Sequence, residues 1–144
     1  MILVPFDAAD PKTRLAPVLD PGERAAFAAA MLDDVLDAVS RANHDHAVRV
    51  LATEPTDVVP EQTPVDVDDR PLTPAVNAVL DARDPPVAVL TADLPLVAPA
   101  TVERLLAAGT GGDVVLAAGL GGGTNALVTH HGRFRVDYHG VSYR

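Results

Sequence analysis

The stretch PVAVLTADLPL, residues 86–96, decides the fold class. Residues 86–90 form a continuous apolar run, which is typical of a central strand that is covered on both faces in a largely parallel sheet. A carboxylate, Asp93, follows this run closely, and Pro95 stiffens the turn after it. The stretch therefore predicts a buried strand that ends near an acid, at the edge of the sheet where α/β proteins bind their ligands.

Apolar runs and helical spacings alternate along the chain. We expect strands over residues 2–6, 47–53, 65–67, 86–90, 113–118 and 124–129, and helices over residues 21–42, 73–83 and 99–108. This alternation predicts an α/β protein with a mixed, mostly parallel sheet sandwiched by helices. No helix fits between the last two strands, so we expect one of them to run antiparallel to the others.

The first helix has the clearest signals in the sequence. Asp20 is suited to the N-cap, and Pro21 is suited to the first helical position. Apolar residues then recur at i, i+4 spacing, which predicts one packed face. The expected face consists of Phe27, Met31, Val35 and Val39.

Length and composition limit the class of protein. A chain of 144 residues fits one domain, over residues 1–144, and the absence of cysteine excludes disulfides, thiolate catalysis and cysteine-ligated metals. No apolar run has the length of a membrane span, and the first residues lack the basic start of a signal peptide. We therefore expect a soluble, cytoplasmic protein without a membrane partner.

The charge balance is strongly acidic. Twenty Asp and Glu residues against 11 Lys and Arg residues give a net charge of −9, which disfavours nucleic acid as a partner. Sixteen of the acids are Asp, and Lys12 is the single lysine. Such a composition suits a high-salt cytoplasm, because salt screens the self-repulsion of the charges that keep the protein in solution. We expect a halophilic source; an ordinary acidic protein from a GC-rich genome is the alternative.

The loop after the first strand carries the basic groups Lys12 and Arg14. This glycine-poor loop cannot wrap its backbone around phosphates as a P-loop does. Lys12 as a point charge and Arg14 as a planar fork can nevertheless neutralise a polyphosphate. Because the chain uses arginine at every other basic position, we favour a function for Lys12 over a solvated side chain kept by chance.

Acids at two other strand ends are candidate metal ligands. Asp93 is well placed to hold Mg²⁺ that bridges phosphates, because Mg²⁺ takes one or two protein carboxylates and leaves its other positions to water and phosphate. The alternative is that Asp93 only caps the next turn. Asp66, Asp68 and Asp69 resemble a metal cluster, but in such an Asp-rich chain we favour solvated surface positions for them.

A glycine-rich stretch, GLGGGTNALV, spans residues 119–128. It is no dinucleotide fingerprint, because a strand and not a helix follows it, and it lacks the Gly-Lys-Ser/Thr of a P-loop. Its backbone can approach a ligand closely, with Thr124 and Asn125 beside amides suited to an anion. A flexible hairpin loop without a ligand is the alternative.

With these motifs the chain resembles the 2-phospho-L-lactate guanylyltransferase family. No single motif is specific, but their order and spacing together are. The matching segments are VPF and KTRLAPVL within residues 4–19, PLTPAVNAVL at 71–80, TADLPL at 91–96, GGGTNALV at 121–128 and FRVDYHGVSYR at 134–144.

The resemblance implies a glycosyltransferase-A-like nucleotidyltransferase fold and a reaction in which GMP passes from GTP to 2-phospho-L-lactate with release of pyrophosphate. It implies Mg²⁺ as cofactor, bound by Asp93, and a role in coenzyme F-420 biosynthesis in archaea. Lys12 and Arg14 are expected to hold the triphosphate. Asn77 and its loop are expected to contact the guanosine. The residues expected to hold the phosphorylated acid are Thr124, Asn125, Gly140 and Ser142.

The resemblance also implies that related chains continue past residue 144 into an Asp-x-Asp segment with further metal ligands, so we expect this sequence to be part of a longer protein. Two alternatives stay open: a nucleotide-binding module without catalysis, and a nucleotidyltransferase of the same fold that acts on phosphoenolpyruvate, a sugar phosphate or molybdopterin. The sequence leaves the oligomeric state open, and a homodimer is compatible with it.

Overall fold

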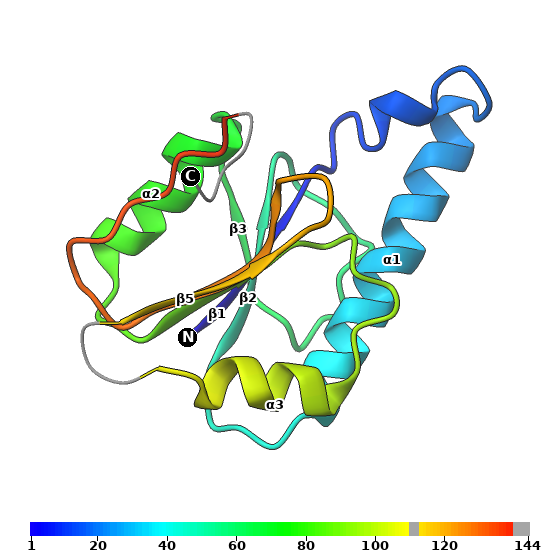
Figure 1. The fold of residues 1–144 in the computed structure, drawn as a ribbon. Helices are drawn as coiled ribbons and strands as arrows, with labels where there is room; N and C mark the ends of the chain where they lie inside the picture. Colours follow the sequence, from blue (N-terminus) through cyan, green and yellow to red (C-terminus); the bar gives the residue numbers. More distant parts are fainter. Residues whose placement is uncertain (110–112, 140–144) are drawn as a thin grey trace.

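In the computed structural model, which describes residues 1–109 and 113–139, six strands form one mixed sheet in the order β3-β2-β1-β4-β6-β5 (Figure 1). The strands are β1 (Ile2–Phe6), β2 (Val48–Ala52), β3 (Val65–Val67), β4 (Val87–Leu90), β5 (Val114–Ala118) and β6 (Thr124–Thr129). The helices are α1 (Pro21–Arg41), α2 (Leu72–Ala82) and α3 (Pro99–Ala107), with a 3₁₀ turn η1 (Thr13–Leu15) before α1. The expected α/β class with a mixed sheet is confirmed.

Strand β4 lies in the middle of the sheet and is buried on both faces. Its four residues are each 1–2% exposed. It pairs in parallel with β1 and antiparallel with β6. Strand β6 is also antiparallel to β5, so the expectation that one of the last two strands reverses direction is confirmed.

Helix α1 begins as the sequence predicts. The Asp20 side chain accepts a hydrogen bond from the Glu23 amide, and the Glu23 carboxylate accepts one from the Asp20 amide, each at 2.9 Å. This capping box satisfies two amides that a helix start otherwise leaves without partners. It fixes the direction in which α1 leaves the loop after β1.

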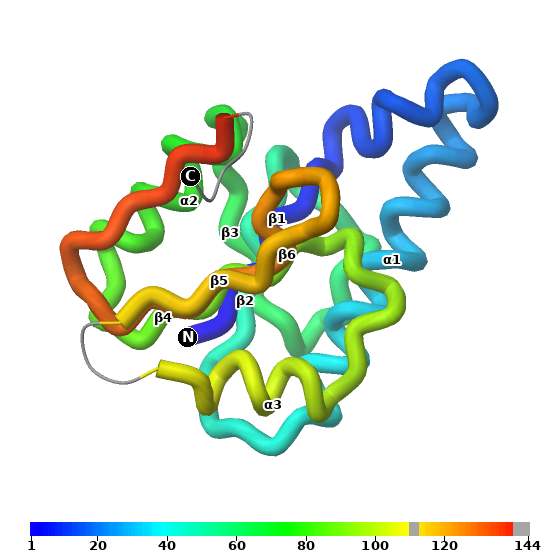
Figure 2. Tube along the Cα trace, in the orientation of Figure 1, coloured from blue at the N-terminus to red at the C-terminus, as the bar shows by residue number. Residues whose placement is uncertain are grey.

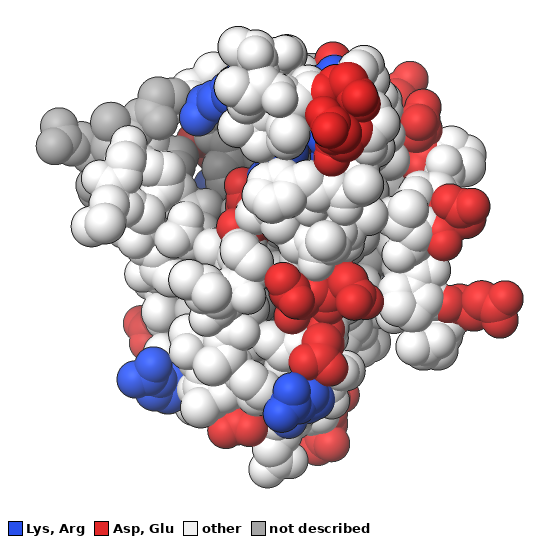
Figure 3. Space-filling model, turned by 90° about the vertical axis from the view of Figure 1, so that its right-hand side faces the viewer, with Lys and Arg blue, Asp and Glu red and all other residues white. Residues whose placement is uncertain are grey.

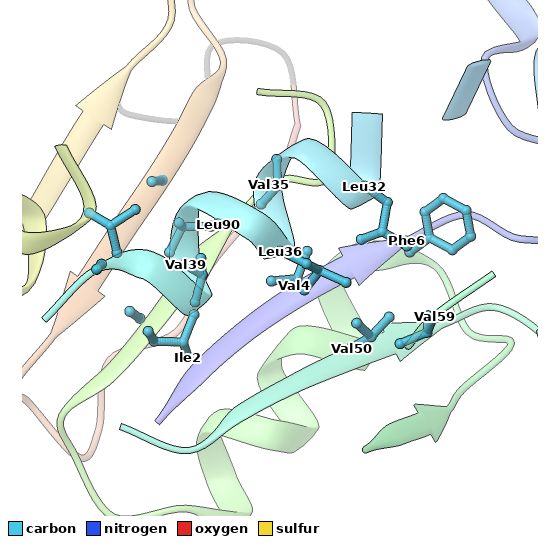
Figure 4. Packing of buried hydrophobic residues seen from close by; sticks show 14 of the residues in the cluster. Ile2, Val4, Phe6, Leu32, Val35, Leu36, Val39, Val50, Val59 and Leu90 are labelled. Atoms are coloured by element: carbon cyan, nitrogen blue, oxygen red, sulfur yellow. The ribbon is translucent and has the colours of Figure 1, made fainter. Parts of the chain in front are cut away.

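The packed face of α1 differs from the predicted one. Phe27 is 46% exposed and Met31 is only partly buried, whereas Val35 and Val39 are buried as expected. The stripe that packs on the sheet runs through Arg24, Ala28, Leu32, Val35, Leu36 and Val39. Figure 4 shows Leu32, Val35, Leu36 and Val39 pointing toward side chains of β1, β2 and β4. Small alanines let the helix approach closely, so the largest side chains did not mark the face.

The two faces of the sheet are covered differently. Helices α1 and α3 pack on one face, and α2 packs on the other together with residues 134–138 (Figures 1 and 2). That segment follows α2 because the Asn77 side chain bonds the main chain of Val136 and the Thr73 hydroxyl accepts from the Tyr138 amide at 3.0 Å. The carboxyl ends of β1–β4 remain open between these layers.

The surface is rich in acidic side chains. Figure 3 shows red acidic groups spread over the face beside α1, with few blue basic groups among them. Within the described part of the chain, no helix combines the length and the apolar character that crossing a bilayer requires.

Candidate active site

A cavity of about 580 Å³ lies at the carboxyl ends of β1, β2, β3 and β4. This volume is in the range of small-molecule binding sites, and the position is the one that open α/β sheets use for ligands. Apolar residues from three layers form its walls. They include Pro5, Phe6, Ala28, Leu51, Leu72, Ala75, Val89 and Tyr138. The polar groups on its wall come from the strand-end loops.

Lys12 and Asp93 meet at this cavity, from loops 81 residues apart. The Lys12 ammonium donates a hydrogen bond to Asp93 Oδ2 at 3.0 Å. The Lys12 side chain is 24% exposed and that of Asp93 is 51% exposed. The sequence predicted that both side chains lie at the same sheet edge, and the structure brings them into contact.

Burial works to raise the pKa of Asp93, but hydrogen bonds from Lys12 and Thr91 outweigh it and hold the pKa below its usual range. Asp93 is therefore a carboxylate at neutral pH. An ionised carboxylate beside an ammonium group forms a dipolar site that suits a metal ion and a phosphate together.

The backbone of Lys12 is in the left-handed region, with φ 54° and ψ 41°. Among the described residues it is the one non-glycine residue with positive φ. Such a conformation costs about 1–3 kcal/mol and is found mainly where surrounding structure imposes it, often at functional sites. No pattern in the sequence predicts this strain.

Arg14 does not reach the wall of this cavity. It lies in η1, one turn beyond Lys12, and is exposed. The structure therefore places the two predicted phosphate ligands differently, with Lys12 at the cavity and Arg14 outside it.

Two residues that the sequence analysis missed hold the loop after β1. The Thr53 hydroxyl accepts hydrogen bonds from the amides of Ala8 and Ala9 at 2.9 and 3.1 Å. From the other side, the Arg24 guanidinium donates to Asp10 and to the main chain of Pro11. A charged residue on the buried stripe of α1 was the signal that could have identified Arg24.

The acids around β3 pair with arginines. Asp66 accepts two hydrogen bonds from Arg49 at 2.5 and 2.6 Å, and Asp68 accepts from Arg70 at 2.5 to 3.2 Å. Hydrogen bonding to arginine lowers the pKa of both carboxyls. The Asp68 side chain is 17% exposed and so more covered than expected, but within the described residues these acids form no group of three that could hold a metal ion. Asp68, Asp69 and Arg70 line the larger cavity at its β3 end.

Asn77, the predicted guanosine contact, is engaged elsewhere. Its amide nitrogen donates to the Val136 carbonyl at 2.9 Å, and its amide oxygen accepts from the Val136 amide at 2.8 Å. Asn77 is not among the residues that line the larger cavity. In this structure its side chain holds the segment that contains Val136 onto α2.

A second cavity, of about 420 Å³, adjoins the first. It lies between α3 and the β4–β6 side of the sheet, and its wall includes Asn125, Leu94 and Leu105. Asp93 lines both cavities. The two cavities therefore meet at the carboxylate that contacts Lys12.

The glycine-rich stretch forms a tight hairpin between β5 and β6. The amide of Gly119 donates to the Gly123 carbonyl at 2.7 Å, and that of Gly122 donates to the Gly119 carbonyl at 3.0 Å. Gly122 has φ 88°, and a Cβ on Gly119 would lie 2.9 Å from Asn125 Oδ1. The positive φ of Gly122 favours glycine there, a side chain at Gly119 would displace the Asn125 amide, and at least the Gly119 and Gly122 amides are not directed at an anion.

The remaining acceptor residues are divided between described and undescribed parts. Asn125 reaches the second cavity, and its carbonyl accepts hydrogen bonds from the amide and hydroxyl of Thr91 at 3.0 and 3.1 Å. Thr124 begins β6 beside it. The predicted contacts Gly140 and Ser142 lie outside the described residues.

Metal ligands are sparse in the site. No group of three or more His, Cys, Asp or Glu side chains within residues 1–109 and 113–139 is arranged to hold a metal ion. Asp93 offers one ionised carboxylate. One carboxylate fits Mg²⁺ that takes its other ligands from phosphate and water, and it does not fit a metal bound by protein alone.

Solved structures share this fold at low sequence identity. A candidate nucleotide-diphospho-sugar transferase from Desulfovibrio desulfuricans G20 matches with a TM-score of 0.67 and 16% identity, over 88% of this chain and 61% of that one. A nucleotidyl transferase from Methanothermobacter thermautotrophicus gives a TM-score of 0.55 and 20% identity, over 88% and 70% of the two chains. The expected nucleotidyltransferase fold is confirmed.

Sequence relatives from halophilic archaea share about half of the residues. A 2-phospho-L-lactate guanylyltransferase of Halomicrobium mukohataei is 57% identical over 143 residues, which cover 99% of this chain and 67% of that protein. One of Natronomonas pharaonis is 58% identical over 143 residues, or 99% and 66% of the two chains. The chain thus spans about two thirds of the length of these relatives. The family described as "Guanylyl transferase CofC like" matches residues 1–144, and the chain belongs to this family.

Proposed function

We propose that this chain carries the nucleotide site of a guanylyltransferase that transfers GMP from GTP to 2-phospho-L-lactate. Pyrophosphate leaves, and lactyl-2-diphospho-5'-guanosine forms for coenzyme F-420 biosynthesis. The named relatives support this activity. The observation that carries it in this chain is the Lys12–Asp93 pair at the junction of two cavities, one sized for a nucleotide and one for a smaller acceptor.

The reaction asks the protein mainly for position and charge. A phosphate oxygen of 2-phospho-L-lactate attacks the α-phosphorus of GTP, and a new P–O bond forms as the bond to the departing pyrophosphate breaks. Transfers of this kind are accelerated by alignment of the two reactants and by neutralisation of phosphate charge. Lys12 would hold the triphosphate from the wall of the larger cavity, and Arg14 would approach it from outside.

Asp93 would hold the metal of the site, which we propose to be Mg²⁺. When bound, Mg²⁺ supplies positive charge to the phosphate oxygens. Asp93 Oδ2 accepts from Lys12, so a metal bound at that oxygen would free the ammonium to turn toward the phosphates. Asp93 would thus hold the Lys12 ammonium in place until GTP binds.

The acceptor side is proposed to lie at the smaller cavity. Asn125 is on its wall and Thr124 is adjacent in the chain, and both stay proposed contacts of 2-phospho-L-lactate together with Gly140 and Ser142. Contact between the α2 loop and the guanosine also stays a prediction, but the Asn77 amide would have to leave Val136 to take part. A homodimer is a prediction that light scattering in high salt tests.

The decisive experiment offers the protein GTP and Mg²⁺ in molar potassium chloride, with and without 2-phospho-L-lactate, and identifies the product by mass spectrometry. We expect pyrophosphate release only when the acid is present, and loss of at least about a hundredfold in turnover for Asp93→Asn, because this change removes the charge that holds the metal. Full turnover by Asp93→Asn would remove Asp93 from the metal site.

The same assay separates the alternatives. GTP binding without pyrophosphate release from any acceptor would favour a nucleotide-binding module without catalysis. Product from phosphoenolpyruvate, a sugar phosphate or molybdopterin, but not from 2-phospho-L-lactate, would favour a different nucleotidyltransferase. Phosphoenolpyruvate keeps the carboxylate of 2-phospho-L-lactate and differs in shape, whereas a sugar phosphate and molybdopterin lack that carboxylate, so the panel tests shape and charge of the acceptor separately.

A further inference from the structure

A buried arginine outside the cavity holds the loop that presents Lys12. Arg24, in the first turns of α1, is 7% exposed. Its Nη1 donates to Asp10 Oδ1 and to the Pro11 carbonyl oxygen, each at 2.7 Å. Arg24 does not line the cavity that Lys12 lines. We propose that Arg24 is a positioning residue for nucleotide binding that acts through Lys12; its effect on GTP rests on the proposed function.

The Pro11 carbonyl is the group through which Arg24 acts. It belongs to the peptide that joins Pro11 to Lys12. The φ angle of Lys12 is measured from the plane of this peptide, so holding the carbonyl restrains the positive φ. On the other side, the Lys12 carbonyl accepts from the Leu15 amide at 2.8 Å. The two hydrogen bonds clamp both peptides that flank Lys12. A left-handed lysine needs such constraints, because without them it relaxes to an ordinary conformation.

The sequence places Arg24 where its guanidinium can reach this peptide. The capping box between Asp20 and Glu23 fixes the first turn of α1, and Arg24 follows on the same buried stripe as Ala28 and Leu32. Pro11 is itself buried and has no amide hydrogen, so its carbonyl is the one main-chain polar group that this residue offers. Arginine is long enough to span the distance from the helix to the loop.

Stability alone explains Arg24 poorly. Within the described residues, one carboxylate, that of Asp10, pairs with the buried guanidinium, and the Asp10 side chain is 65% exposed. The Nε–H of Arg24 is buried without a partner there. Buried ion pairs can often be replaced by apolar side chains at little cost in stability. An arginine with one unsatisfied donor is therefore better explained by a role other than packing. The hydrogen bond from Arg24 to the Pro11 carbonyl indicates that this role is to hold the Pro11–Lys12 peptide.

The first test measures the loop itself and requires no nucleotide. Arg24→Met keeps an unbranched apolar stem and removes the guanidinium that donates both hydrogen bonds. We expect faster hydrogen exchange of the Leu15 amide in Arg24→Met, while amides of β4 exchange as before. Arg41→Met is the matched control, because Arg41 lies on the same helix and its Nη1–Asp37 pair is exposed. Unchanged exchange at Leu15 in a folded Arg24→Met would overturn the proposal.

The second test measures binding by calorimetry in molar potassium chloride, with GTP and Mg²⁺ and separately with tripolyphosphate. We expect Arg24→Met to weaken both by about tenfold, the loss of one well-placed charged contact. Arg24→Lys is expected to recover part of the loss. Asp10→Ala removes one acceptor of Arg24 at the surface and leaves Pro11, so it is expected to give a smaller loss; it also serves if Arg24→Met does not fold.

A double-mutant cycle separates positioning from a general effect on the fold. In a Lys12→Ala background, we expect Arg24→Met to change the affinity for tripolyphosphate by less than about twofold, because the group it positions is absent. An equal loss in both backgrounds would show that Arg24 does not act through Lys12 and would overturn the proposal. If the wild-type protein bound neither ligand, the proposed function would fail, while the exchange test would still decide whether Arg24 holds the loop.

Discussion

The loop that carries Lys12 and the glycine hairpin at residues 119–123 each contain a residue with positive φ. The two loops adopt this conformation for different reasons. Gly122 adopts φ 88° at no steric cost, in a turn closed by its own amides. Lys12 adopts φ 54° against the preference of its side chain, under constraint from Arg24 and in contact with Asp93. A lysine is kept in a strained position where glycine would be easier. We therefore base the proposed phosphate site on the strained lysine rather than on the glycine-rich stretch.

The largest effect is expected when Lys12 is replaced by glycine. Lys12→Gly should weaken GTP binding by about a hundredfold, since a charged hydrogen bond to phosphate contributes about 1.5–3 kcal/mol. It should leave the free energy of unfolding unchanged or raise it by up to about 1 kcal/mol, because glycine accepts the left-handed conformation. Calorimetry and urea unfolding measure the two quantities. Arg41→Gly is the control for loss of one positive charge, and unaltered GTP affinity in Lys12→Gly would contradict the assignment.

The hairpin should behave in the reverse manner. Gly122→Ala is expected to lower the free energy of unfolding by about 1–2 kcal/mol, because alanine at this φ is strained. It should not alter the affinity for GTP, since Gly122 is not among the residues that line the larger cavity. Gly121→Ala is a matched control, as a Cβ there would meet nothing within 4 Å. Weaker GTP binding by Gly122→Ala would mean that the hairpin belongs to the nucleotide side.

Asn77 gives a smaller test of which groups contact the nucleotide. Asn77→Ala removes two hydrogen bonds to the main chain of Val136, and we expect it to cost about 1–2 kcal/mol of unfolding free energy. GTP affinity should change little if the amide only holds that segment. Loss of GTP affinity with unchanged stability would restore the guanosine contact that the sequence suggested.

The smallest effect concerns the titration of Asp93. Burial raises its pKa, and hydrogen bonds from Lys12 and Thr91 lower it further than burial raises it. Because the folded pKa lies below the ordinary value, the stabilisation is present above that value and is lost as the pH falls through the folded pKa. Lys12→Met removes one of the lowering hydrogen bonds, so the pKa should rise. Carbon-13 NMR of the side-chain carboxyl follows it; an unchanged midpoint would show that Lys12 does not contact Asp93 in solution.

Much of the fold could be predicted because its signals are local. The apolar run of β4, the cap of α1 and the absence of a helix between β5 and β6 each specify structure within a short window. The packed face of α1 could not be predicted in the same way. Its alanines give a weak hydrophobic signal, and the large apolar side chain of Phe27 pointed to the wrong face. The partner of Asp66 could not be predicted either, since Arg49 lies on another strand of the sheet.

The site was predictable only where topology alone decides it. Lys12 and Asp93 follow strands that share a sheet edge, so their meeting followed from the order of the strands. Three features depend on tertiary contacts between separate segments of the chain. They are the left-handed backbone of Lys12, the hydrogen bond from Arg24 to Pro11, and the hydrogen bonds between Asn77 and Val136. No spacing in the sequence predicts such contacts. A charged residue on the buried stripe of α1 does indicate that its side chain has a specific partner.

One NMR titration tests the division between the two loops most directly. GTP with Mg²⁺ is added to ¹⁵N-labelled protein in high salt, followed by 2-phospho-L-lactate. We predict that GTP first shifts the amides of residues 12–15 and 91–94 and leaves those of 119–123 in place until the acid is added. Early shifts in the hairpin with none around Lys12 would contradict the assignment of Lys12 and Asp93 as the nucleotide site.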